Sequence, residues 1–167
     1  MSRKRPFSYE EFKQVYSKVP RLCVDLIIQD PKGQVLLLRR EEEPSVGMWH
    51  LPGGTVLFRE EVEQAIKRIA QEEVGVAVRV EGLVGFIEFL NEERGNQAFH
   101  SLSLAVVCSI QEKISRTPKR QFFKVVPENT IKEQGLFLEK ILSGRWKDAA
   151  CDDPNCTDED CLKDSAA

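Results

Sequence analysis

The chain lacks any long apolar run and has no surplus of positive charge. No stretch approaches the roughly 18 consecutive apolar residues that a membrane helix needs. Its basic start is followed by Pro6 and polar residues instead of the apolar core of a signal peptide. The formal net charge of −3 gives no basis for the clustered basic surface that non-specific nucleic-acid binding requires. We therefore expect a cytoplasmic protein that binds neither membranes nor nucleic acid.

Histidine and cysteine are also scarce, with two and five residues in the whole chain. Cys23 and Cys108 lie in apolar runs and are typical of buried small side chains. Three more fall in the acidic segment 144–167, namely Cys151, Cys156 and Cys161. Their even spacing lacks the close pairs of zinc sites, and the segment has no apolar periodicity. We expect a disordered tail, with metal capture or redox sensing by its thiols as an alternative.

The remaining composition is that of one globular domain, and its patterns alternate between helix and strand. Helices are predicted over 8–19, 60–74 and 127–142. Strands are predicted over 22–29, 34–39, 76–80, 83–90, 99–110 and 122–126, the first two forming a hairpin around the turn 30–33. This order favours an α/β (α+β) fold, a mixed β-sheet sandwiched between helices. The division is an N-terminal helical segment (1–20), a main domain (21–143) and the tail.

The helix predicted over 60–74 carries a carboxylate on its apolar side. At about 100° per residue, one apolar stripe gathers six residues: Val62, Ala65, Ile66, Ile69, Ala70 and Val74. Glu73 falls near the middle of this stripe. An unpaired buried charge costs on the order of several kcal/mol, so Glu73 needs an arginine or a cation, unless it bends to solvent near Gly75. The adjacent Glu72 favours a divalent cation, and the glycines at 53 and 54 allow a backbone oxygen to join an all-oxygen site for Mg²⁺.

The stretch 53–76, GGTVLFREEVEQAIKRIAQEEVGV, resembles the Nudix box. That pattern is G, five residues, E, seven residues, then R-E-U-x-E-E-x-G-U, where U is a bulky aliphatic residue. Seven residues fall on it: Gly54, Glu60, Arg68, Glu72, Glu73, Gly75 and Val76. The preceding Trp49-His50-Leu51-Pro52 is similar to the family's W-x-x-P-G-G. Two positions depart from the pattern, because Ile69 replaces the first Glu and Ala70 a larger aliphatic residue.

Residues 8–110 are also similar to one Nudix-related subgroup, the GDP-mannose mannosyl hydrolases. That subgroup lacks the same Glu and uses a single Mg²⁺. Its catalytic His lies in the loop before the penultimate strand, and the corresponding loop here, 115–121, has no His. The likeness therefore implies a Nudix fold without fixing where water attacks.

The resemblance implies a Mg²⁺-dependent Nudix hydrolase, with Mn²⁺ as an alternative metal. Its substrate would be a nucleoside diphosphate linked to another group, with nucleotide sugars as candidates. Glycosyl cleavage of the mannosyl hydrolase type is one alternative, and a degenerate module that binds nucleotide with little turnover is another. A second copy of the chain is a candidate partner.

The resemblance also assigns roles to individual residues. The metal ligands would be the Gly53 carbonyl, Glu72 and Glu73, with Glu60 as a supporting carboxylate and Arg68 orienting a box carboxylate. Arg40 would contact the diphosphate, or be a plain surface residue. Two further side chains have open roles: Trp49 stacks on a base or packs in the core, and His100 is the general base or a structural residue. The other candidates for the base are Glu88, Glu92 and Glu93.

Overall fold

The computed structural model describes residues 7–42, 45–94 and 97–143. The tail 144–167, predicted to be disordered and carrying three cysteines, lies outside the described residues. Within the described part no helix is long and apolar enough to cross a membrane. The division of the chain into three segments stays a prediction.

Within residues 7–42, 45–94 and 97–143, seven strands form two sheets. The first has the order β4-β1-β6-β5, with β4 Gly53–Thr55, β1 Arg21–Ile28, β6 Gln97–Ser109 and β5 Arg79–Arg94. The second has the order β3-β2-β7, with β3 Trp49–His50, β2 Val35–Arg39 and β7 Arg120–Phe123. β1 and β6 are parallel and all other pairs are antiparallel, so the four-stranded sheet is mixed.

The predicted hairpin of the first two long strands is wrong. The turn itself forms, since Gly33 N donates to Asp30 O at 2.9 Å. Beyond it only Gln29 and Val35 bridge, and β1 and β2 then enter different sheets. Each strand is buried along nearly its whole length because it lies inside its own sheet. β1 lies between β4 and β6, and β2 lies between β3 and β7. The predicted loop 91–97 is largely strand, because β5 and β6 extend to Arg94 and from Gln97.

The helices are α1 Tyr9–Tyr16, α2 Val62–Ile69 and α3 Lys132–Leu142, with a π-helix, η1 Ala70–Val74, continuing α2. A reciprocal cap begins α1: Ser8 N donates to Glu11 Oε2 at 2.8 Å and Glu11 N to Ser8 Oγ at 3.3 Å. α3 begins later than predicted because the backbone before it is used by β3. Trp49 N donates to Asn129 O and Ile131 N to Trp49 O, both at 2.9 Å.

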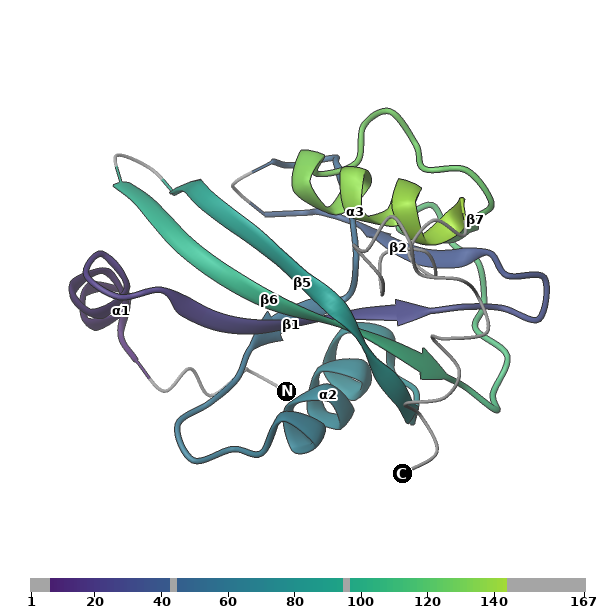
Figure 1. Cartoon of the computed structure of the whole chain (residues 1–167), viewed down its shortest axis with the longest axis horizontal. Coiled ribbons are helices and arrows are strands. Elements are labelled where there is room, and N and C mark those ends of the chain that lie inside the picture. Colours follow the sequence, from purple (N-terminus) through teal and green to yellow (C-terminus); the bar gives the residue numbers. More distant parts are fainter. Residues whose placement is uncertain (1–6, 43–44, 95–96, 144–167) are drawn as a thin grey trace, which may run out of the picture.

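The first sheet lies between α2 on one face and α3 on the other (Figure 1). The second sheet contributes side chains to both core clusters. One core cluster joins α2 and η1 to side chains such as Val24, Leu26 and Val106. The other joins α3 to Ile27, Ile87 and Ala105. Successive residues of β1 thus face opposite layers, as the two-residue period of a strand requires. The predicted α+β class with a mixed sheet between helices is confirmed, with a second sheet added.

Candidate active site

The two glycines of the box form the edge strand β4, paired with the central strand β1. Leu22 accepts from Val56 N at 3.0 Å, and Leu26 N donates to Pro52 O at 2.8 Å. This antiparallel register makes Asp25 and Gly53 a pair without mutual hydrogen bonds. The Gly53 amide and carbonyl are therefore directed away from β1, at the open edge of the sheet. Such a carbonyl is placed to bind a ligand.

Gly53 also has no room for a side chain. A Cβ atom there would lie far inside contact distance of Asp25 Oδ1 and 2.9 Å from Val24 O. Pairs without mutual hydrogen bonds bring the two Cα atoms to about 4.5 Å, which explains the crowding. A Cβ at Gly54 would lie 3.2 Å from the Ile69 side chain. The glycines thus let the strand approach both a buried carboxyl group and α2.

The helix after the glycines buries most of the predicted apolar stripe. Ala65, Ile66 and Ile69 of α2 are buried, as are Ala70 and Val74 of η1. Val62 is 37% exposed, so its inclusion in the buried stripe is wrong. Its position at the first residue of α2 leaves its side chain at the rim of the core.

The carboxylates Glu72 and Glu73 lie on the π-helical turn, not on a regular α-helix as predicted. Glu73 is half-buried and Glu72 is exposed. The turn ends at Gly75, whose φ of 78° and ψ of 24° are left-handed. Arg120 Nη1 donates to Val74 O at 2.7 Å and so satisfies a carbonyl of the last turn. Single π-turns are frequent at functional sites, and this one sets the directions of both carboxylates.

Arg68 connects three parts of the box. Its Nε and Nη2 donate to the two oxygens of Glu60 at 2.6 and 2.8 Å. Nη2 also donates to Thr55 O at 3.0 Å, and Nη1 to Glu72 Oε2 at 3.3 Å. Hydrogen bonds from Arg68 hold the pKa of Glu60 below its usual range, and hydrogen bonds to Glu60 raise the pKa of Arg68. Arg68 therefore stays charged and orients Glu72, while both oxygens of Glu60 face a guanidinium.

Ile69 fills space beside the glycines in place of the missing carboxylate. Its side chain is 1% exposed and belongs to the α2 core cluster. An aliphatic group there can neither bind a cation nor accept a proton from water.

Two predicted substrate contacts lie around β3. The Trp49 indole is 8% exposed and packs edge-on against Phe123, with ring centroids 4.8 Å apart. This burial favours its alternative role in the core. Arg40 is half-buried, and its backbone N donates to Met48 O at 2.9 Å. Its charge acts on His50, the neighbouring histidine of β3.

His50, for which the sequence predicted no role, has a strongly shifted pKa. Burial, aided by the nearby Arg40, lowers its pKa to about 4. Its Nδ1 lies 2.7 Å from Leu51 O, and a carbonyl can only accept, so the neutral ring carries its proton on Nδ1. The signal available in the sequence was its position between Trp49 and Leu51.

The candidates for the general base lie on β5 and β6. His100 lines a pocket of about 210 Å³ with residues 16–20, and none of the other predicted site residues lines it. Its Nε2 is buried without a hydrogen-bond partner among the described residues. Glu92 accepts from Arg21 Nη2 at 2.7 Å and from Ser101 Oγ at 2.8 Å, so it belongs to a polar cluster at that end of the sheet. A base role for either residue stays a prediction.

A buried carboxyl and amide behind Gly53 were also missed. Asp25 is 5% exposed, and burial raises its pKa to about 6. Its Oδ2 accepts from Gln134 Nε2 at 3.0 Å, and Gln134 is itself 4% exposed. The available signal was an Asp between Val24 and Leu26 in a strand that is otherwise apolar.

The donors present fit a Mg²⁺ ion that keeps part of its water shell. In residues 7–42, 45–94 and 97–143, no three His, Cys, Asp or Glu side chains form a ready-made metal cluster. Mg²⁺ does not need one, since it is usually bound through one or two carboxylates, waters and substrate phosphates. Arg68 bonds Thr55 O and Ile69 packs on Gly54, so strand and helix run side by side toward Gly53 and the turn with Glu72 and Glu73.

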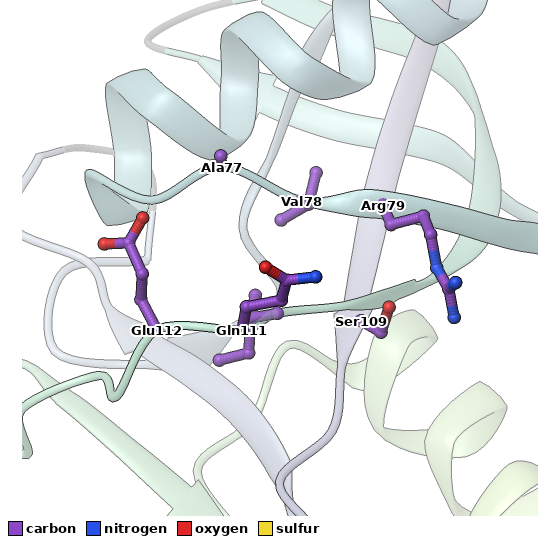
Figure 2. Close-up of a pocket in the computed structure, with 7 residues that line it drawn as sticks. Ala77, Val78, Arg79, Ser109, Gln111 and Glu112 are labelled. Carbon is purple, nitrogen blue, oxygen red and sulfur yellow. The ribbon is translucent and has the colours of Figure 1, made fainter.

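A pocket among the described residues lies elsewhere (Figure 2). It has a volume of about 530 Å³ and lies between the start of β5 and the end of β6, with Arg79 and Ser109 at one side and Glu112 at the other. None of the predicted site residues lines it. The exposed Glu72 and the half-buried Glu73 of η1 do not line this pocket.

Comparison with known proteins identifies the family. The NUDIX domain model matches residues 19–140. A MutT NUDIX hydrolase structure from Burkholderia pseudomallei superposes with a TM-score of 0.63 and 25% identity, covering 74% of this chain and 98% of that one. The chain therefore belongs to the NUDIX family and is a Nudix hydrolase.

Two relatives indicate which kind of Nudix hydrolase the chain resembles. The low-salt glycan biosynthesis protein Agl8 of Haloferax volcanii is 36% identical over 106 residues, which are 62% of this chain and 67% of that protein. An ADP-ribose pyrophosphatase of Methanocaldococcus jannaschii is 30% identical over 131 residues, 77% of this chain and 75% of its own length. The chain is a Nudix hydrolase of the pyrophosphatase and MutT kind, a group that generally uses divalent metals.

Proposed function

We propose that this protein hydrolyses a nucleoside diphosphate joined to a sugar, with Mg²⁺ bound by Glu72, Glu73 and the Gly53 carbonyl. The observation that carries the proposal is that the Gly53 carbonyl faces away from β1 in a strand that contacts the helix bearing the two carboxylates, through Arg68 to Thr55 O and through Ile69 to Gly54. The names of two relatives support the proposed substrate class. ADP-ribose is a nucleoside diphosphate carrying a sugar, and glycan biosynthesis draws on activated sugars.

When bound, Mg²⁺ neutralises phosphate charge and stabilises the charge that develops as the anhydride breaks. The chain's own residues prepare the site for it. Arg68 orients Glu72 through a hydrogen bond, and the buried Gln134 bonds both Asp25 and the Leu51 amide beside Gly53. Arg40, beside β3, is a proposed contact for the diphosphate. Location in the cytoplasm and pairing with a second copy stay predictions.

Because Ile69 stands where the box pattern has a Glu, two alternative functions stay candidates. Ile69 is sealed in the core, so the base must come from elsewhere in the chain, attack must occur at the sugar carbon, or turnover must be slow. These outcomes give different products. Attack at phosphorus yields a nucleoside monophosphate and a sugar phosphate, whereas attack at carbon yields a nucleoside diphosphate and a free sugar.

The test is a panel of ADP-, GDP- and UDP-sugars with Mg²⁺, with products separated by ion-exchange chromatography. We expect phosphorus attack, with the oxygen of ¹⁸O-labelled water recovered in a phosphate. Glu73→Gln should lower kcat by about 100-fold or more because it removes a metal ligand. The matched control is Glu63→Gln, since Glu63 lies on the same helix but only pairs with Lys67 at the surface. Equal activity of both variants would remove Glu73 from the site, and nucleotide binding without turnover would favour the binding module.

A further inference from the structure

The side-chain amide of Gln134 links two segments that flank Gly53. Gln134 lies near the start of α3 and is 4% exposed. Its Oε1 accepts from Leu51 N at 3.0 Å, and its Nε2 donates to Asp25 Oδ2 at 3.0 Å. Leu51 and Asp25 are 83 and 109 residues away in sequence. One side chain of α3 thus ties the segment before Gly53 to the central strand.

The chain from Leu51 to Gly53 is fixed at three consecutive residues. The Leu51 amide is held by Gln134, and the Pro52 carbonyl accepts from Leu26 N at 2.8 Å. Gly53 packs directly against Asp25 Oδ1, where a Cβ atom does not fit. Because Gly53 itself makes no ladder hydrogen bond to β1 in this register, the contacts at these three residues set the position of its carbonyl.

A glutamine is chemically suited to this place. Its carboxamide offers a donor for the carboxyl of Asp25 and an acceptor for the amide of Leu51. A Glu at 134 would set an acceptor against the Asp25 carboxylate, and an aliphatic residue would leave the Leu51 amide unpaired and remove one donor from Asp25, which is costly. The arrangement needs one group that donates and accepts at once.

We propose that Gln134 and Asp25 are positioning residues that hold the Gly53 carbonyl where it binds the metal. The proposal rests on the proposed function, because it takes Gly53 as a metal ligand. Mg²⁺ demands near-ideal octahedral geometry, so a carbonyl that is free to shift binds it more weakly. Gln134 and Asp25 would not touch the metal themselves. They would affect its binding only by fixing the backbone of residues 51–53.

The experiment measures Mn²⁺ binding to the full chain without substrate, by electron paramagnetic resonance of free Mn²⁺. Gln134→Met keeps the size of the side chain and removes both hydrogen bonds. We expect its Kd for Mn²⁺ to rise about 10- to 100-fold, the range for residues that orient metal ligands. The control is Ile141→Val, a cavity variant of the same helix and core. It should lower the melting temperature yet change the Kd by less than about twofold, since it touches none of the three contacts.

Conservative variants separate positioning from general loss of stability. Asp25→Asn keeps the shape against Gly53 and an acceptor for Gln134 Nε2, so its Kd should stay within about fivefold of the wild type, whereas Asp25→Ala should resemble Gln134→Met. If Gln134→Met does not fold, Gln134→Asn tests the same bridge, because it is too short to reach both partners.

Two results would overturn different claims. A folded Gln134→Met protein with the wild-type Kd, while Glu73→Gln loses Mn²⁺, overturns the positioning role and leaves the proposed function intact. Mn²⁺ binding that is absent from the wild type, or insensitive to Glu73→Gln, overturns the proposed function and the positioning role with it.

Discussion

The pair formed by Arg68 and Glu60 offers a quantitative test of how the Nudix box is held together. Two parallel hydrogen bonds join the guanidinium to the carboxylate at 2.6 and 2.8 Å. Such bidentate pairs are stronger and more specific than single contacts. The perturbation is a double-mutant cycle with Arg68→Gln, Glu60→Gln and both together, which isolates the pair from the bonds of Arg68 to Thr55 and Glu72.

The expected size follows from how exposed the two side chains are. Arg68 is 28% and Glu60 13% exposed, so the pair lies between a surface ion pair and a buried one. Exposed pairs contribute about 0.2–1 kcal/mol, and hydrogen bonds to charged groups about 1.5–3 kcal/mol. We expect a coupling free energy of about 2 kcal/mol. For a chain of this size, about 2 kcal/mol corresponds to roughly 4–8 °C in Tm, and Arg68→Gln should lose at least that much because it also loses the bonds to Thr55 and Glu72.

The assay is urea unfolding of all four proteins at pH 7.5 and again at pH 3.5, without metal. Glu60 has a depressed pKa in the folded state, so the stability it contributes is present above its ordinary value of 4.5 and is lost as the pH falls below that. The coupling should therefore shrink at pH 3.5. A coupling below about 0.5 kcal/mol at pH 7.5 would refute the reasoning, because the pair would then behave as an ordinary surface contact.

Three further predictions concern single residues. His50 has a folded pKa of about 4 against 6.5 unfolded, so stability should be full above pH 6.5 and fall by about 2 kcal/mol between pH 6.5 and 5; urea unfolding of His50→Gln should lack that part of the decline, and an equal decline in both proteins contradicts it. Gly53→Ala should destabilise the fold by about 2 kcal/mol or more, since its Cβ meets Asp25 and the Val24 backbone; an unchanged melting curve would mean that β4 can shift freely. Ile69→Glu should lower the free energy of unfolding by several kcal/mol in the absence of metal, as an order-of-magnitude cost of charging a site that is 1% exposed; a stability equal to the wild type would show that this side chain reaches solvent.

The buried residues of the helix in the Nudix box could be predicted from sequence because helical periodicity depends only on nearby residues. Helical periodicity placed Ala65, Ile66 and Ile69 in the core, as found, and a helix turn involves only residues three or four apart. The same periodicity could not predict the π-helix over Ala70–Val74. One residue more per turn there depends on what the turn packs against and on Arg120, which bonds Val74 O from another sheet.

The sequence by itself determined the family, the α+β class and the residues that can supply oxygen ligands, because these depend on residue types at fixed spacing. Only the tertiary structure decided which groups meet. It sent β1 and β2 into separate sheets, turned the Gly53 carbonyl to the sheet edge and brought Gln134 against Asp25. Such contacts join residues up to 109 positions apart, and they arise from the packing of whole layers, on which local pattern carries no information.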